Sequence, residues 1–110
     1  MRSSKSAKYL APAIGARVVQ FANGLDSPPV ATVENLDAAA SVAIRYQESD
    51  DGNTWTDIAN TTATVDPGKN DVQEVASARA QIALFASGNV LINFSVDRVV
   101  NGSPTNLGTA

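Results

Sequence analysis

The feature that most constrains this chain is the alternation of apolar and polar side chains within short segments. The clearest case begins at residue 42, where Val42, Ile44 and Tyr46 alternate with Ala43, Arg45 and Gln47. Residues 90–100 repeat the pattern, with Val90, Ile92, Phe94 and Val96 on one face. Successive side chains of a strand point to opposite faces, so this period predicts half-buried antiparallel strands.

Turn residues separate these segments at the spacing of roughly 8–12 residues that is typical of sandwiches and barrels. Examples are Asn23-Gly24, Asp66-Pro67-Gly68 and Ser87-Gly88-Asn89, whose residue types favour turns. The expected strands are 16–21, 30–36, 42–48, 54–58, 62–65, 72–75, 80–85 and 90–100. The sequence therefore predicts an all-β, antiparallel β-sandwich of seven to eight strands, with a small barrel as the second choice.

In a sandwich, every second side chain of a strand enters the space between the sheets. At 44% apolar residues, much of it Ala and Val, the chain can fill only a thin core. The side chains that the alternation places there are Ile44, Tyr46, Trp55, Ile82, Ile92, Phe94 and Val96.

The charge distribution divides the chain into three parts. Four of the eight basic residues precede the first acidic residue, Asp26. Residues 1–13 have no helical period and are polar and basic up to Lys8, which predicts an extended basic arm. Residues 14–102 form the predicted sandwich domain, and residues 103–110 a polar C-terminal tail.

We expect the arm to make few contacts within its own domain, because it has too little apolar surface to offset its ordering entropy. A neighbouring subunit would then bind it. The apolar anchors would be Tyr9, Leu10 and Ile14. Beside acidic groups of the neighbour would lie Arg2, Lys5 and Lys8. Nucleic acid is not an expected partner, because the body of the protein is acidic and would repel phosphates.

The residue types exclude most catalytic chemistry. The chain has no Cys and no His, so the usual nucleophile–base pairs and most transition-metal sites cannot be built. A calcium loop would need a Glu where Thr61 stands, and Gly52 comes too early for one. Carboxylate pairs such as Glu34 with Asp97 are better interpreted as solvated surface acids. We therefore expect no enzyme, no cofactor and no bound metal.

The segment 49–55 predicts a structural turn. Its Ser-Asp-Asp-Gly-Asn-Thr-Trp sequence is similar to the Asp-box hairpin corner, with one residue fewer between Asp and Gly, and the residues that carry the likeness are Ser49, Asp51, Gly52 and Trp55. In sialidase-like proteins this corner is structural and remote from the catalytic site. Gly52 is expected to have a positive φ. Trp55 is also the one serious candidate for an aromatic sugar platform.

The N-terminal segment is not expected to be a secretion signal, because Pro12, Gly15 and Arg17 interrupt its apolar residues. No segment approaches the ~20 apolar residues of a membrane-spanning helix. We expect synthesis in the cytoplasm and no membrane partner.

Residues 30–101 resemble the small β-sandwich structural proteins of tailed bacteriophages. The likeness rests on Thr32-Val33-Glu34-Asn35, on the alternating strand 42–48 and on the corner 49–58. Bacterial adhesin modules share these features. The resemblance implies an Ig-like sandwich and a component of the virion, above all a decoration (cement) protein on the capsid surface. Its partners would be the major capsid protein or other virion subunits, and it would form a homo-oligomer.

Two alternatives remain open at the level of sequence. The chain could be a stand-alone Ig-like binding module that recognises carbohydrate or a cell surface through Trp55. It could also be a small accessory protein of the phage tail or neck. An enzyme is only a formal third possibility.

Overall fold

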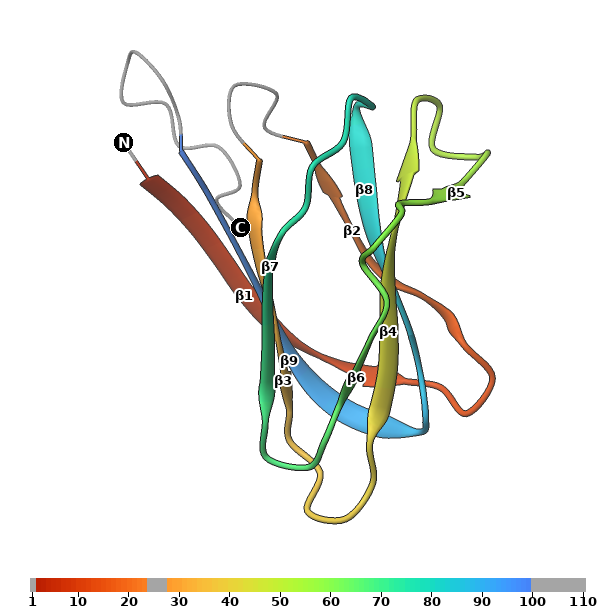
Figure 1. Cartoon of the computed structure of the whole chain (residues 1–110), viewed down its shortest axis with the longest axis vertical. Helices are drawn as coiled ribbons and strands as arrows, with labels where there is room; N and C mark the ends of the chain where they lie inside the picture. The colour runs from red at the N-terminus through yellow and green to blue at the C-terminus, as the bar shows by residue number, and fades with distance from the viewer. Residues whose placement is uncertain (1, 24–27, 100–110) are drawn as a thin grey trace.

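Two antiparallel sheets packed face to face make up the structure, a computed structural model that describes residues 2–23 and 28–99. In the first sheet the order is β1 (Arg2–Ala11), β9 (Val90–Val99), β3 (Val30–Asn35) and β7 (Asn70–Glu74). In the second the order is β2 (Ala16–Ala22), β8 (Gln81–Ser87), β4 (Val42–Ser49) and β5 (Thr56–Asp57), with β6 (Ala63–Val65) also paired to β4. Figure 1 shows the two layers.

The all-β sandwich is thus confirmed, with nine strands in the described part of the chain instead of seven to eight. The strand order, however, differs from the Ig-like one. Apart from the β4–β5 pair, neighbouring strands in a sheet are not consecutive in the sequence, and the chain crosses between sheets at almost every connection. An Ig-like sandwich pairs several consecutive strands as hairpins. The order β1-β9-β3-β7 over β2-β8-β4 is that of a jelly roll.

The core lies between the sheets and includes six of the seven residues that the alternation selected. Ile44, Tyr46, Ile82, Ile92, Phe94 and Val96 are all buried. The rings of Phe94 and Phe21 lie 5.6 Å apart. Tyr46 is fully buried, and its burial raises the pKa of the hydroxyl well above the usual value. Trp55 is the exception: it is only half-buried, because β5 is just two residues long and begins after it.

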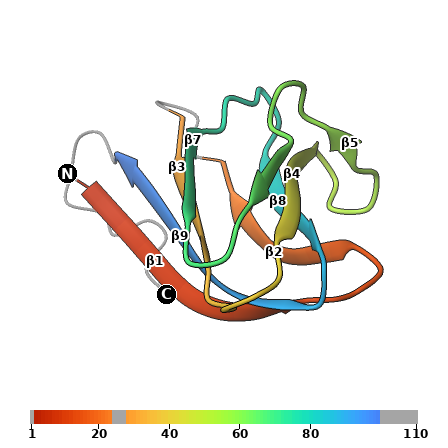
Figure 2. The ribbon, with the colours of Figure 1, turned by 60° about the horizontal axis from the view of Figure 1, so that its bottom comes forward.

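The most important correction concerns residues 1–13. Residues 2–11 are extended, as predicted, but they are strand β1 and pair with β9 over their whole length. The expectation of few contacts within their own domain is therefore wrong, because the ladder with β9 supplies the backbone hydrogen bonds that the sequence argument left out. Figure 2 shows β1 at the margin of the molecule, beside β9. The predicted tail, residues 103–110, and the turn residue Gly24 lie outside the described residues.

Candidate interaction surfaces

The corner at residues 49–55 is held by its own polar atoms. The Ser49 hydroxyl accepts a hydrogen bond from the Gly52 N–H at 2.9 Å, and Asp51 Oδ1 accepts from the N–H groups of Asn53 and Thr54 at 2.8 Å. These two donors lower the pKa of Asp51 to about 2. Gly52 has a φ of 79°, as predicted. Trp55 Nε1 donates to the Gly52 carbonyl at 3.2 Å, so Trp55 closes the corner.

Beside this corner lies a polar cleft of about 320 Å³, lined by Glu48, Ser49, Asp50, Asp51, Thr54, Thr56 and Arg79. Its acidic groups already have partners within the chain. The Ser77 hydroxyl donates to Glu48 at 2.6 Å, and Arg79 forms ion pairs with Glu48 and Asp50. Among the described residues, no three His, Cys, Asp or Glu side chains are grouped to hold a metal ion. The charged side chains that line the cleft therefore form a network of ion pairs and hydrogen bonds with one another.

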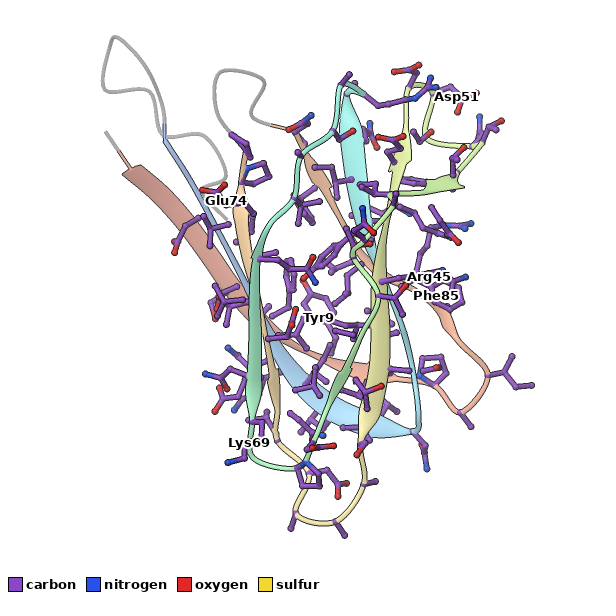
Figure 3. All side chains as sticks on the ribbon, in the orientation of Figure 1. Tyr9, Arg45, Asp51, Lys69, Glu74 and Phe85 are labelled. Atoms are coloured by element: carbon purple, nitrogen blue, oxygen red, sulfur yellow. The ribbon has the colours of Figure 1, made fainter. Side chains whose placement is uncertain are left out.

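The outer face of the second sheet carries paired arginine and aromatic side chains. The guanidinium of Arg45 lies 3.8 Å from the centre of the Phe85 ring, and Arg45 Nε lies 2.9 Å from Asp57. Figure 3 shows Arg45 and Phe85 together on this side of the molecule. The guanidinium of Arg17 lies 5.3 Å from the Trp55 ring centre. Because Arg17 lies over the ring and Nε1 is bonded to Gly52, Trp55 offers less of a sugar platform than the sequence suggested.

The outer face of the first sheet is different, because apolar side chains are exposed on it. Leu10 pairs with Leu91 in the β1–β9 ladder, and the Leu36 N–H donates to the Leu91 carbonyl at 3.0 Å. The three side chains, on or beside neighbouring strands, are 61%, 45% and 37% exposed for Leu10, Leu91 and Leu36. We call them the leucine row. Val72, on β7 of the same sheet, is 61% exposed.

The residues predicted to bind a partner are thus divided by the alternation of β1. Lys8 and Leu10 are exposed, and Ile14 in the following loop is 89% exposed. Tyr9 is half-buried and packs against the core, and Figure 3 shows it between the two sheets. Tyr9 is therefore part of the domain's own packing. Arg2 and Lys5 occupy β1, paired with Val99 and Val96.

Sequence reasoning missed Leu36 and Leu91, the other members of the row. A signal for Leu91 was present: it is a large apolar residue on the polar face of an otherwise strictly alternating strand. Leu36 ends a predicted strand, and only the sheet order places it beside Leu91.

No protein-family model matches the sequence, and no curated protein is similar to it. Among solved structures, two with a TM-score above 0.5 have a similar fold. The chain is similar to PirA, with a TM-score of 0.53 and 12% identity over 84% of this chain and 90% of that one. It is also similar to a structure of Bacillus endospore appendages, described as disulfide-linked pili, with a TM-score of 0.54 and 13% identity over 92% and 88%.

A third solved structure is a mitogen from Yersinia pseudotuberculosis, with a TM-score of 0.44 and 12% identity over 100% of this chain and 96% of that one. Identities this low show the fold alone, a small all-β sandwich. They assign neither a phage family nor an Ig-like one. Among the described residues there is no helix that could span a membrane.

Proposed function

We propose that this chain is a non-enzymatic structural protein of a virion, a decoration (cement) protein that binds the capsid surface through the outer face of its first sheet. The observation that carries the proposal is the leucine row. Its partners would be the major capsid protein or neighbouring virion subunits, as the resemblance of residues 30–101 to phage structural proteins implies. Jelly-roll sandwiches occur both in viral shells and in lectins, so the function has to be inferred from the surface residues and not from the fold.

Exposed apolar side chains are informative when they gather. Four of the five large apolar side chains that are exposed in the described part of the chain belong to the first sheet or extend it: Leu10, Leu36, Val72 and Leu91. Fully burying a leucine side chain contributes about 1.5–3 kcal/mol, so covering the row would supply a substantial part of a binding free energy. Such a patch with polar residues around it is typical of a protein–protein interface.

Polar residues of this face suit a protein partner as well. Ser6 lies among Asn93 and Ser95, whose side chains donate to its hydroxyl at 3.2 Å. These small, uncharged groups lie between charged residues of the neighbouring strands, since Asn93 pairs with Lys8 on β1 and with Glu34 on β3. The absence of His and Cys from the whole chain, and the paired state of the carboxylates in the cleft, support a role without catalysis.

The proposal can be tested with two matched variants that each place an arginine on one face. Leu91→Arg interrupts the leucine row, and Gln20→Arg changes an exposed residue of β2 on the other sheet. Purified proteins are mixed with phage shells that lack the decoration protein, and binding is measured by co-sedimentation. Leu91→Arg should weaken binding at least about 30-fold, the effect of losing a hot-spot residue, while Gln20→Arg binds as the wild type does.

Both variants should melt within a few degrees of the wild type, which shows that the fold is intact. Equal binding by wild type and Leu91→Arg would overturn the proposed surface. Binding to purified tails and not to heads would favour the tail or neck alternative. Binding to a glycan array, lost on Trp55→Ala and kept in Leu91→Arg, would favour the carbohydrate-binding module.

A further inference from the structure

The four edges of the two sheets are protected to very different degrees. An exposed edge strand invites pairing with another chain, and proteins usually blunt it with bulges, short strands or charges. The β2 edge has an irregularity between Arg17 and Val19. The opposite edge of that sheet is formed by strands of two and three residues. At the far edge of the first sheet, β7 is five residues long and carries Asp71 and Glu74.

The β1 edge lacks most of these devices. It is ten residues long, contains no proline, and keeps one register with β9 from Arg2 to Ala11. No strand of the described residues pairs with its other side. Its sequence has basic residues at positions 2, 5 and 8 and no acidic one, and the side chain of Lys8 is exposed.

The direction of the backbone groups on β1 follows from a hydrogen bond two strands away. The Leu91 carbonyl accepts from the Leu36 N–H, so Leu91 directs its backbone groups toward β3. Ile92 therefore directs its groups toward β1, where it pairs with Tyr9. By alternation, Ala7 and Tyr9 bond to β9, whereas Ser4, Ser6, Lys8 and Leu10 present their N–H and C=O groups at the free edge.

The charge of β1 indicates what kind of strand could pair with its free edge. Two copies of β1 paired edge to edge would bring together their basic residues, with no acidic residue on either strand to compensate. Like charges on paired strands are destabilising, and opposite charges are favourable. The edge therefore disfavours self-pairing and favours an acidic strand.

We propose that the free edge of β1 receives an extended, acidic segment of a partner protein, which adds a fifth strand to the β1-β9-β3-β7 sheet. This inference rests on the proposed function and specifies the partner's chemistry. Main-chain bonds to Ser4, Ser6, Lys8 and Leu10 would set the register. Lys8 would face a carboxylate, and Leu10 would extend the apolar contact of the leucine row.

The first experiment uses a synthetic probe. An end-blocked eight-residue peptide alternates valine and glutamate, and a control peptide has lysine in place of glutamate. The acidic peptide should bind at least about tenfold more tightly, and less so at high salt. In hydrogen-exchange NMR, binding should slow exchange of the Ser6, Lys8 and Leu10 amides, while the Ala7 and Tyr9 amides are already slow in the free protein.

Three variants isolate the edge. Ser6→Pro removes an outward N–H, which an edge strand tolerates, and should abolish peptide binding without unfolding the protein. Ser6→Ala loses the hydroxyl but keeps the N–H and should bind as the wild type does. Lys8→Glu should reverse the preference between the two peptides, and it keeps the test decisive if Ser6→Pro does not fold.

Equal affinity for both peptides, or protection of β7 amides and not β1 amides, would overturn the inference. The variants also separate it from the proposed function. If Ser6→Pro binds shells normally but Leu91→Arg does not, the edge inference fails and the capsid role stands. If the acidic peptide binds β1 but the wild-type protein does not bind shells, the edge site stands and the capsid role fails.

Discussion

The outer faces of the two sheets differ in whether their large side chains have partners within the chain. On the second sheet, Arg45 lies over Phe85 and bonds Asp57, and Arg17 lies over Trp55. Gln47 also donates to Asp57, at 2.8 Å. On the first sheet, Leu10 and Leu91 lie side by side with much of their surface open to water.

The difference teaches where to look for function in a small sandwich. Side chains that already have partners within the chain stabilise the fold and have little left to offer another molecule. Apolar side chains that stay exposed contribute little to folding, but burying them against a partner would stabilise a complex. The comparison makes quantitative predictions about stability on each side of the core.

A substitution in the core between the two sheets should lower the free energy of unfolding more than any substitution on either outer face. Phe94 is 3% exposed and packs against Phe21. Phe94→Ala should lower the free energy of unfolding by about 3–5 kcal/mol, as measured by urea denaturation. A loss under about 1 kcal/mol would mean that the space between the sheets is not the main source of stability.

The second largest loss of stability is expected from a substitution in the corner that joins β4 to β5. Gly52→Val forces a β-branched residue into a φ of 79° and should cost about 1–3 kcal/mol. Steric crowding is not the reason, because a Cβ at this position would lie 3.8 Å from its nearest neighbouring atom, Gln81 Oε1. Gly52→Asn is the control, since asparagine tolerates positive φ and should cost less. Equal melting temperatures for wild type and Gly52→Val would refute the role of this turn.

On the second sheet, Arg45→Ala should cost about 0.5–1 kcal/mol, because it removes a cation–π contact and an ion pair that are both partly exposed. Arg45→Lys keeps the charge but loses the planar stacking on Phe85, so its stability should be intermediate. If thermal denaturation shows no loss for either variant, the second face is not stabilised by its own pairs and the comparison fails.

The contribution of the corner to the stability of the fold should depend on pH. Its hydrogen bonds hold the pKa of Asp51 at about 2, below the ordinary value of 3.8. Because the folded-state pKa is the lower one, the charged form stabilises the fold above about pH 4, and this contribution is lost as the pH falls from about 4 to 2. Asp51→Asn should flatten the decline in melting temperature over that range. An unchanged slope would show that Asp51 does not contribute to it.

The smallest effect on stability is expected on the first sheet. Leu10→Ser should change the free energy of unfolding by no more than about 0.5 kcal/mol, because the side chain is 61% exposed. The same variant should bind shells more weakly than the wild type in co-sedimentation. A loss of stability as large as that of Arg45→Ala would remove the contrast between the two faces.

Local sequence was enough for several parts of the fold. The alternation in residues 42–46 and 90–97 correctly predicted which large apolar side chains are buried, because a strand's side-chain period is a local property. Gln47, predicted on the opposite face, is buried as well. The positive φ of Gly52 was predicted for the same reason. For the candidate surface, Lys8, Leu10 and Ile14, which were predicted to bind a partner, are exposed, whereas Tyr9, predicted for the same role, packs against the core.

Pairing between distant strands was decided only by the tertiary structure. Ser87-Gly88-Asn89 was predicted as a tight connection, and it is short, yet it joins two different sheets. There Gly88 donates its N–H to the Pro12 carbonyl at 2.9 Å. Residues 2–11 became a strand because β9 lies beside them, and the leucine row exists because the sheet order brings three separate leucines together. The sequence by itself determined which residues alternate and where the chain turns, since these depend on neighbouring residues. Only the packing of residues far apart in the chain decided which edge and which face stay open.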